Sequence, residues 1–396
     1  MIRPMHPASG PRAEATLAGP RNLQGVTSPV SQPTYLSTRG EAPALAFDDA
    51  LLAGLARDGG LYVPQAWPTL SAAEIAAIPG RSFAEVAADT VARFAAPSAQ
   101  ARAEILSLAQ AAYARFGHPA TTPLVEIDRN MFVLELFHGP TLAFKDVAMQ
   151  LLARLMDRVL AQRGERATIV GATSGDTGGA AIEAFRGSSR VNCIVLFPNG
   201  RVSDVQRRMM TTAREDNVHA VAIEGNFDDC QALVKAMFND LAFRDRVRLA
   251  GVNSINWARI VAQITYYLVA AAALGAPHRK VSFAVPTGNF GDIFAGFAAR
   301  SMGLPIDKLA IATNDNDILR RAHAEGLYEV RGVSATSSPS MDIQISSNFE
   351  RYLFEASGRD ATWVRGRMGE LAQSGRFSLG EKVTGRLRED FTAASA

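Results

Sequence analysis

The chain has 396 residues, of which 47% are hydrophobic and 20% charged, and it contains 32 glycines. This length and composition are typical of a folded protein with two or three domains around a large core. A formal net charge of +2, without a dense block of Lys or Arg, argues against a nucleic-acid-binding surface. The two cysteines, Cys193 and Cys230, lack the spacing of a zinc site or a disulfide framework, and no apolar run approaches the roughly 20 residues of a membrane span. We therefore expect no metal and no membrane or nucleic-acid partner, and a reducing compartment, the cytoplasm.

The N-terminal part of the chain divides into two segments. Residues 1–32 carry several prolines and no apolar period, which predicts a segment outside the fold: a disordered extension, a transit-like leader or a product of an upstream start codon. Residues 33–120 are expected to form a mainly helical domain. Its helices are expected to begin at Asp48, Ser71 and Ser82, because Asp and Ser side chains cap helix N-termini. The first of these helices, residues 49–56, is expected to be stopped by Gly59-Gly60.

From residue 121 onward, short apolar strands and longer amphipathic helices are expected to alternate. The expected strands are 131–136, 167–172, 192–197, 220–223, 281–285 and 309–312. The expected helices are 145–163, 177–185, 203–215, 228–239, 257–274 and one that starts at Asp292. Because the strands are continuously apolar, both faces of each sheet are expected to be covered by helices. The region 121–396 is thus predicted to be a doubly wound α/β fold, with two subdomains and with ligands at the carboxyl ends of the strands.

Lys145 is the first candidate functional residue. Lysine occurs at only five positions, and arginine supplies the rest of the 41 basic residues. Lys145 follows the apolar residues Leu142, Ala143 and Phe144. A lysine amine with a lowered pKa is a nucleophile, a role that arginine cannot take. The alternative is a lysine whose stem packs on apolar surface while its charge reaches solvent at a helix start.

Three polar loops occupy the positions where this fold binds ligands. Thr173–Gly179 and Pro286–Asp292 each connect a strand to a helix and contain glycines, so backbone amides there suit a carboxylate or a phosphate. The alternatives are a capped helix start in the first loop and a tight turn with positive φ at Gly288 and Gly291 in the second. Neither loop has the spacing of a nucleotide-binding motif.

The third loop, Asn253–Arg259, leads into the long helix over residues 257–274. Asn256 and Arg259 are expected to face the same cleft, where Arg259 suits an anionic substrate group. The alternative is a helix cap followed by a surface cation. Together, a reactive lysine and two anion-binding loops indicate an aldehyde cofactor that carries a phosphate, and pyridoxal phosphate (PLP) fits that description.

Several blocks of the sequence, in order, resemble the threonine synthases of the bacterial and fungal type, in the tryptophan-synthase-β-like class of PLP enzymes. The resemblance includes Lys145 in the pattern Thr-x-x-Phe-Lys-Asp and the three loops described above. It also includes three further blocks: Tyr35–Gly40, Asp58–Pro64 and Ser340–Arg351. Asp176 stands where many relatives of this class have Asn, and threonine synthases of this type have Asp. This departure favours the family over cysteine synthases and threonine dehydratases.

The resemblance implies a role for each matched residue. Lys145 would bind PLP as a Schiff base and then move protons among Cα, Cβ and Cγ of the substrate. The residues that would hold the cofactor, besides Lys145, are Gly288, Asn289, Phe290, Gly291 and Asp176. The residues that would bind the substrate are Ser174, Gly175 and Thr177, together with Asn256 and Arg259 from the third loop.

The implied reaction converts O-phospho-L-homoserine and water to L-threonine and phosphate, in a protein that is a monomer or a homodimer. Two alternatives are a threonine-synthase-like phospho-lyase and a truncated, catalytically impaired PLP-binding protein. Family members continue into a segment with Asp-Pro-His-Thr-Ala-Val-Gly, which this sequence, ending at Ala396, does not contain. Its Thr is similar to the hydroxyl that meets the pyridine nitrogen in this class, so the resemblance leads us to expect a truncated C-terminus.

Overall fold

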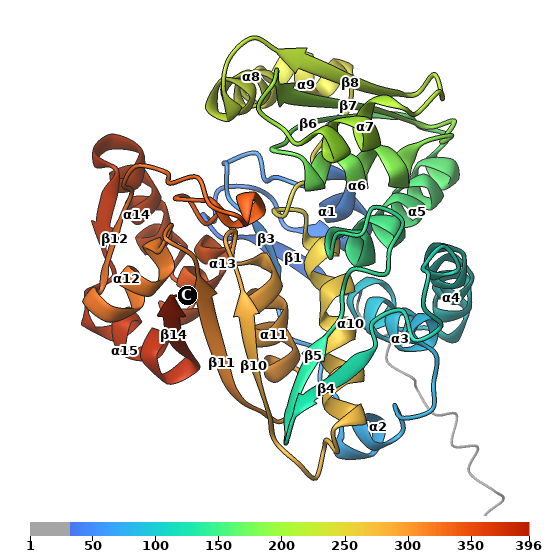
Figure 1. The fold of residues 1–396 in the computed structure, drawn as a ribbon, viewed down its shortest axis with the longest axis vertical. Coiled ribbons are helices and arrows are strands. Elements are labelled where there is room, and N and C mark those ends of the chain that lie inside the picture. The colour runs from blue at the N-terminus through green and yellow to red at the C-terminus, as the bar shows by residue number, and fades with distance from the viewer. Residues whose placement is uncertain (1–31, 396) are drawn as a thin grey trace, which may run out of the picture. The chain divides into compact units, whose positions relative to one another are not determined.

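The computed structural model describes residues 32–395, and the extension expected at residues 1–32 lies outside them apart from Gln32. Gln32–Ala396 forms one compact unit. A domain boundary near residue 120 therefore stays a prediction. Within this unit, helices and strands alternate along the chain as expected (Figure 1). In the described part of the chain, no helix is both long enough and apolar enough to cross a membrane.

The N-terminal region contains a small antiparallel sheet that the sequence analysis missed. Its strands pair in the order β2-β1-β3, and they are β1 (Thr34–Ser37), β2 (Leu45–Ala46) and β3 (Tyr62–Pro64). With two to four residues each, they are too short to show a period in the sequence. The sequence predicted a mainly helical region here and did not predict these three strands.

Four helices complete this region: α1 (Phe47–Ala53), α2 (Ala72–Ala76), α3 (Phe83–Ala95) and α4 (Ala99–Tyr113). Ser71 and Ser82 begin α2 and α3 as predicted, each in a capping box with the Glu three residues later. The prediction for α1 was wrong at both ends. Its N-cap is Ala46 rather than Asp48, and it stops at Gly54, whose φ of 63° ends the helix before Gly59-Gly60 is reached.

The first α/β layer is a four-stranded parallel sheet in the order β8-β7-β6-β9. Its strands are β6 (Ala167–Ala172), β7 (Val191–Pro198), β8 (Val218–Ile223) and β9 (Leu249–Ala250). Its helices are α5 (Lys145–Arg163), α6 (Asp176–Phe185), α7 (Asp204–Thr211), α8 (Phe227–Asn239) and α9 (Leu241–Arg246). Every strand and helix predicted in this stretch is present, with ends that differ by a few residues.

Both faces of this sheet are covered by helices, as the apolar strands predicted. Ile169 and Val195 belong to the main core cluster with α5 and α6, whereas Val170 and Leu196 belong to a second cluster with α8. Alternate residues of one strand point to opposite faces, so these two clusters lie on the two sides of the sheet. The doubly wound class is therefore confirmed for this layer.

A second parallel sheet, in the order β10-β11-β14, follows the long helix α10 (Trp257–Ala273). Its strands are β10 (Val281–Pro286), β11 (Ile306–Thr313) and β14 (Phe391–Ser395). The other elements of this part are α11 (Gly291–Ser301), α12 (Ile318–Glu325), β12 (Leu327–Glu329), η1 (Pro339–Met341), α13 (Phe349–Ala356), α14 (Ala361–Ser374), β13 (Arg376–Ser378) and α15 (Gly380–Asp390). None of the elements after β11 was predicted.

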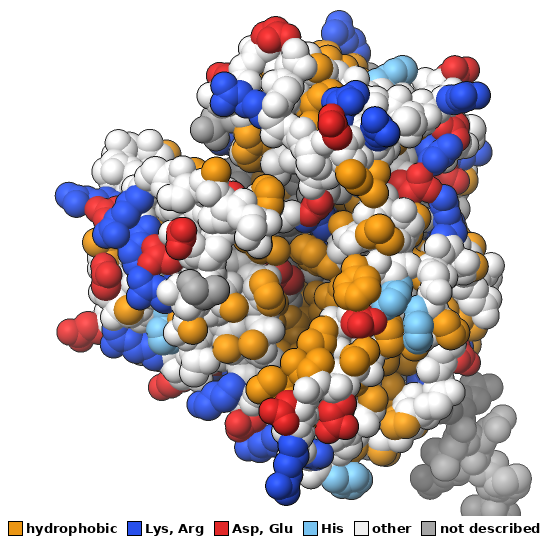
Figure 2. Space-filling model, viewed as in Figure 1, with side chains coloured by type: hydrophobic (Ala, Val, Ile, Leu, Met, Phe, Trp, Pro, Cys, Tyr) orange, Lys and Arg blue, Asp and Glu red, His pale blue; other side chains and the backbone are white. Residues whose placement is uncertain are grey.

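The strand expected at residues 131–136 belongs to a separate two-stranded hairpin, β4 (Leu124–Asp128) and β5 (Met131–Leu134). It was expected to be buried, but Met131 and Val133 are exposed, and Phe132 and Leu134 are only half-buried. Figure 2 shows apolar side chains gathered on this part of the surface. The exposed apolar residues of the hairpin are Val125, Ile127, Met131 and Val133.

The strand order of the first sheet, β8-β7-β6-β9, indicates where a ligand binds. From β6 the chain moves to β7 and β8 on one side, and it then returns to β9 on the other side of β6. The carboxyl ends of β6 and β9 therefore face a crevice at the point where the strand order reverses, which is where open α/β sheets bind ligands. The loops that begin at Thr173 and Gly251 follow these two strand ends.

Candidate active site

A buried turn holds Lys145 at the first position of α5. The Asp146 carboxylate accepts hydrogen bonds from the Thr141 amide at 2.7 Å and from the Thr141 hydroxyl at 2.8 Å. Gly139 packs against this carboxylate so closely that a Cβ there would lie 2.4 Å from the Asp146 Cβ. The Gly, Thr and Asp of the lysine-containing motif thus build the turn from which Lys145 projects.

The Lys145 amine lies in a nearly closed environment. The residue is 9% exposed, and its Nζ lies 3.2 Å from the Asp176 Oδ2 atom. Burial lowers the pKa of Lys145 because it penalises the charged amine, and the nearby Arg259 guanidinium acts in the same direction. The carboxylates of Asp176 and Asp292 oppose this shift. The result is an amine that gives up its proton more readily than a surface lysine does.

Asp176, the first residue of α6, is held by donors from three different elements. Gln206 of α7 donates to Asp176 Oδ1 at 2.7 Å, while Lys145 and the Ser340 hydroxyl both donate to Oδ2. Burial alone would raise the pKa of Asp176, but Lys145 and these hydrogen bonds lower it below its ordinary value. Asp176 is therefore an anion directly beside the lysine. Asp176 was predicted from the sequence to hold the cofactor, whereas neither Gln206 nor the contact of Ser340 was predicted.

The side chain of Thr173 stabilises the loop Thr173–Gly179 through hydrogen bonds to the backbone of the loop. The buried Thr173 hydroxyl accepts hydrogen bonds from the amides of Gly175 at 3.0 Å and Gly178 at 2.9 Å. The Gly175 amide is thus used within the loop, and its predicted contact with a substrate does not fit this arrangement. The neighbouring amides of Asp176 and Thr177 lie in the first turn of α6, where a helix offers them no carbonyl. Ser174 and Thr177 remain the predicted substrate contacts of this loop.

The loop between β10 and α11 contains Gly288, Asn289, Phe290 and Gly291. Among the described residues, no protein acceptor meets the amide N–H groups of these four positions. Unpaired amides at a helix start form an anion site, as the sequence analysis expected. The alternative of positive φ at the two glycines was wrong, because the left-handed residue is Phe290, with φ of 63°.

Close contacts explain the two glycines of this loop instead. A Cβ at Gly288 would lie 2.9 Å from the Ile343 Cδ1 atom, and a Cβ at Gly291 would lie 3.1 Å from the Asn348 Nδ2 atom. Phe290 is fully buried, with its ring centroid 5.2 Å from that of Phe349. The residues that follow η1 therefore cover the loop, and only glycine leaves room for them.

Asn256 and Arg259, the two residues predicted from the third loop, have different surroundings in the structure. Asn256 is fully buried and caps α10, with Oδ1 accepting from the Ala258 amide and Nδ2 donating to the carbonyls of Leu51 and Gly251. These bonds use all of its polar hydrogens, so the predicted role of Asn256 in substrate binding has no free donor. Its side chain instead ties α10 to α1.

Arg259 keeps a free donor near the lysine. It is 3% exposed, and among the described residues its side chain makes one hydrogen bond, from Nη1 to the carbonyl of Val252 at 3.4 Å. Its Nε is buried without a partner among the described residues. Burial lowers the pKa of Arg259 to about 10, although the residue remains a cation at neutral pH. A buried cation with an unused N–H group is suited to an anionic ligand.

Comparisons with known proteins identify the class to which this fold and site belong. A family model described as "Pyridoxal-phosphate dependent enzyme" matches residues 116–366, which include Lys145 and all three loops. A second model, described as "Threonine synthase N terminus", matches residues 34–113. The chain is 55% identical over 345 residues to the threonine synthase of Pseudomonas aeruginosa, which covers 87% of this chain and 73% of that protein.

Solved structures give the same result. The structure of PLP-bound threonine synthase from Brucella melitensis matches this chain with a TM-score of 0.88 and 64% identity. The match covers 92% of this chain and 78% of the Brucella chain. Threonine synthase from yeast has a TM-score of 0.84 and 40% identity, with coverages of 92% and 76%. The chain belongs to the threonine synthase family of PLP-dependent enzymes.

The residues of the site fit PLP. Lys145 offers a buried amine whose pKa is lowered, as attack on an aldehyde requires. The amides of Gly288–Gly291 have no protein acceptor among the described residues, and they precede α11, as a phosphate group requires. Arg259 leaves a second buried donor for the anionic substrate that such a cofactor processes. The cofactor expected from the sequence is therefore consistent with the donors that the site provides.

Proposed function

We propose that this chain converts O-phospho-L-homoserine and water to L-threonine and phosphate, with PLP attached to Lys145 as a Schiff base. The single observation that carries the proposal is the buried Lys145 amine 3.2 Å from Asp176, in a chain of the threonine synthase family. PLP, when bound, supplies an electron sink for the electrons released as protons leave the carbon atoms of the substrate.

Lys145 is proposed to be the base and acid of the reaction. Its lowered pKa keeps a fraction of the amine neutral, and a neutral amine can accept a proton from Cα. Asp176 then stabilises the resulting ammonium, because a carboxylate at hydrogen-bond distance favours the charged form. Burial and Asp176 thus act in opposite directions on the same amine, so that it can both take up and release protons.

Two anion-binding regions are proposed to orient the reactants. The amides of Gly288–Gly291 would hold the phosphate of the cofactor at the start of α11. Ser174 and Thr177, beside the first turn of α6, would bind the carboxylate of the substrate. Arg259 would bind the phosphate of the substrate, since its buried cationic side chain has an unused donor.

We also propose the cytoplasm as the location of the enzyme and a monomer or a homodimer as its assembly. Both Cys193 and Cys230 are free and buried, which fits a reducing compartment. Size-exclusion chromatography with light scattering would decide between the two assemblies.

The test is a product assay on the purified chain with PLP and O-phospho-L-homoserine. Equal amounts of L-threonine and phosphate are expected, together with a visible absorbance band of bound PLP. Lys145→Ala is expected to abolish both, whereas Lys235→Ala, which alters an exposed lysine of α8, is expected to leave them unchanged.

Two results of this assay would contradict the proposal. Phosphate with 2-oxobutyrate but without threonine would identify a phospho-lyase. An absorbance band that depends on Lys145, without any product, would identify a protein that binds PLP and is catalytically impaired.

A further inference from the structure

The segment between β12 and α13, residues 330–348, reaches from the C-terminal part of the chain to the active-site lysine. In its middle lies η1, and the hydroxyl of Ser340 in η1 donates to the Asp176 Oδ2 atom. The two residues are 164 positions apart in the sequence. This bond is the contact through which the segment meets the pair formed by Lys145 and Asp176.

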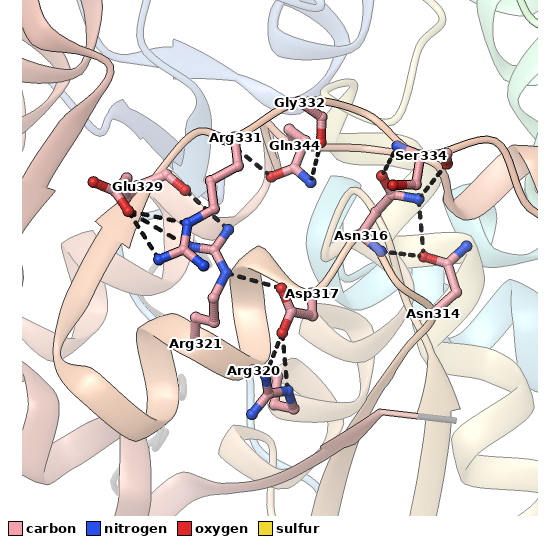
Figure 3. A network of polar contacts seen from close by, with 10 residues as sticks. All are labelled: Asn314, Asn316, Asp317, Arg320, Arg321, Glu329, Arg331, Gly332, Ser334 and Gln344. Carbon is pink, nitrogen blue, oxygen red and sulfur yellow. Dashed lines mark hydrogen bonds and ion pairs between the residues drawn. The ribbon is translucent and has the colours of Figure 1, made fainter.

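The base of this segment is held by side-chain amides, as Figure 3 shows. Gln344 accepts from the Arg331 amide at 3.4 Å and donates to the Gly332 carbonyl at 3.3 Å, which joins the outgoing and returning limbs. Asn316 accepts from the Ser334 amide at 2.9 Å and donates to the Ser334 carbonyl at 2.8 Å. The first part of the segment, at Ser334, is thereby fixed to the chain that follows β11.

A second set of hydrogen bonds fixes the middle of the segment, around η1, and the Asp342 carboxylate is the acceptor in all of them. Its carboxylate accepts from the Thr336 amide at 2.9 Å and from the Thr336 hydroxyl at 2.7 Å. It also accepts from Asn314 at 2.8 Å and from Asn316 at 3.0 Å. Because Ser340 lies only two residues before Asp342, these bonds restrict where its hydroxyl can point.

Residues 341–346 of the same segment cover the loop proposed to bind the cofactor phosphate. The Ile343 side chain and the Met341 backbone would meet a Cβ at Gly288 at 2.9 Å and 3.3 Å. The Ser346 hydroxyl donates to the Gly288 carbonyl. One segment therefore contacts both the phosphate loop and the carboxylate beside the lysine.

We propose that Ser340 is a positioning residue that fixes the Asp176 carboxylate beside the Lys145 amine. Gln206 holds only Oδ1, so Ser340 and Lys145 are the donors on Oδ2. Without the Ser340 hydroxyl, the carboxylate can rotate away from the amine while it keeps its bond to Gln206. This role of Ser340 deepens the proposed function, and the expected effect of Ser340 on turnover rests on that function.

The test compares Ser340→Ala with Ser340→Thr, which keeps a hydroxyl, and with Ser338→Ala. Ser338 is an exposed serine of the same segment whose side chain makes no capping bond to η1, so it is a matched control. Two measurements use the full chain freed of PLP: hydrogen exchange of residues 334–343, and the pH midpoint for acetylation of Lys145 by acetic anhydride, followed by mass spectrometry. The rate of threonine formation by the loaded enzyme is the third measurement.

Ser340→Ala is expected to make exchange of the segment about tenfold faster, as loss of one hydrogen bond to a charged group implies. It is also expected to lower the acetylation midpoint of Lys145 by about one pH unit. The sign follows from the charges that face this amine: Asp176 and Asp292 raise its pKa, Arg259 lowers it, and a displaced Asp176 raises it less. Ser340→Thr is expected to restore the original values, and Ser338→Ala to retain them.

An unchanged or raised midpoint in Ser340→Ala would overturn the proposal, and so would equal effects of Ser340→Ala and Ser338→Ala. If the unmodified chain forms no threonine, the proposed function fails by itself. Exchange and acetylation still test Ser340 in that case, because neither needs substrate or cofactor.

Discussion

At the scale of single residues, the site depends on one carboxylate and one amine whose charges are set by their surroundings. Asp176 is held by Lys145, Gln206 and Ser340, and these donors lower its pKa below the ordinary value of 3.8. A group with a lowered pKa in the folded state contributes stability above its unfolded pKa. This contribution is lost as the pH falls through the folded value.

The sign of this linkage gives a prediction for Asp176→Asn in the cofactor-free chain. The substitution is expected to reduce the free energy of unfolding by on the order of 1 kcal/mol, by a constant amount above about pH 5. The difference from the unmodified chain is expected to shrink below pH 3.8, because there the unfolded state takes up a proton while the folded Asp176 is still ionised. Urea unfolding at a series of pH values measures it, and a difference that widens at low pH would contradict the assignment.

Gly175 gives a second prediction at this scale. Its φ is 142°, a conformation that side chains avoid, and a Cβ would lie 2.3 Å from atoms of the Gln206 amide. Gly175→Ala is expected to cost about 1–3 kcal/mol of stability and to displace Gln206 from Asp176. Threonine formation is therefore expected to fall with it.

Gly187→Ala is the matched control for this substitution. Gly187 also has a positive φ, of 79°, but nothing lies within 4 Å of a Cβ placed there. This variant is expected to lose stability and to keep its activity. Urea unfolding and the product assay check both variants, and equal activity of the two would show that Gln206 is not needed at Asp176.

At the scale of helices and strands, local signals account for the correct predictions. Ser82 caps α3 because its side chain accepts from the Glu85 amide while Glu85 accepts from the Ser82 amide. Gly164 ends α5 in the left-handed conformation, with φ of 64°, as expected from its place after the last apolar turn. The missed strands of the N-terminal sheet, such as β1, are short, and their strand conformation comes from pairing with distant segments.

The cap of α3 can be tested directly. Ser82→Ala is expected to lower the free energy of unfolding by about 1 kcal/mol, because it removes the hydroxyl that accepts from the Glu85 amide, while the bond from the amide of residue 82 to Glu85 stays. Ser107→Ala, an exposed position inside α4, is the control and is expected to change stability by less than about 0.5 kcal/mol. Urea unfolding measures both, and equal values would exclude a stabilising cap at Ser82.

At the scale of the whole molecule, Arg351 joins parts of the chain that the sequence places far apart. This fully buried guanidinium donates to the carbonyl of Tyr62 in β3 at 2.9 Å and to the carbonyl of Ile255 before α10 at 2.5 Å. It also donates to the Asn348 side chain. Next to it, the Glu350 carboxylate accepts from the Thr38 hydroxyl at 2.6 Å. Segments of the chain that contain Tyr62, Ile255 and Asn348 thus meet around one buried cation.

Arg351→Met is expected to lower the free energy of unfolding by about 3 kcal/mol or more, since it leaves several buried acceptors without a donor. Arg351→Lys is not expected to restore it, because an ammonium cannot reach three acceptors in a planar arrangement. Arg57→Met, which removes an exposed ion pair with Asp245, is the control and is expected to cost less than about 1 kcal/mol. Urea unfolding compares the three variants, and a full rescue by lysine would contradict this account.

The sequence by itself determined the class of the fold and, by its resemblance to known proteins, the family, and it predicted Lys145 and the anion-binding loops as parts of the site. These features depend on neighbours in the chain: apolar strands, glycines at helix starts and a lysine motif are local patterns that physical chemistry can interpret directly. The predicted positions of the PLP lysine and its loops at strand ends follow from those patterns, as the turn around Lys145 illustrates.

Only the tertiary structure decided which groups surround the lysine amine. Gln206 and Ser340 reach Asp176 from segments 30 and 164 residues away, and no local pattern indicates a contact of that kind. For the same reason, no local pattern shows that the side-chain donors of Asn256 are used by Leu51 and Gly251, or that the Gly175 amide is used by Thr173. A residue type shows which chemistry is available, but the packing of distant segments decides which of its hydrogen bonds remain free for a ligand.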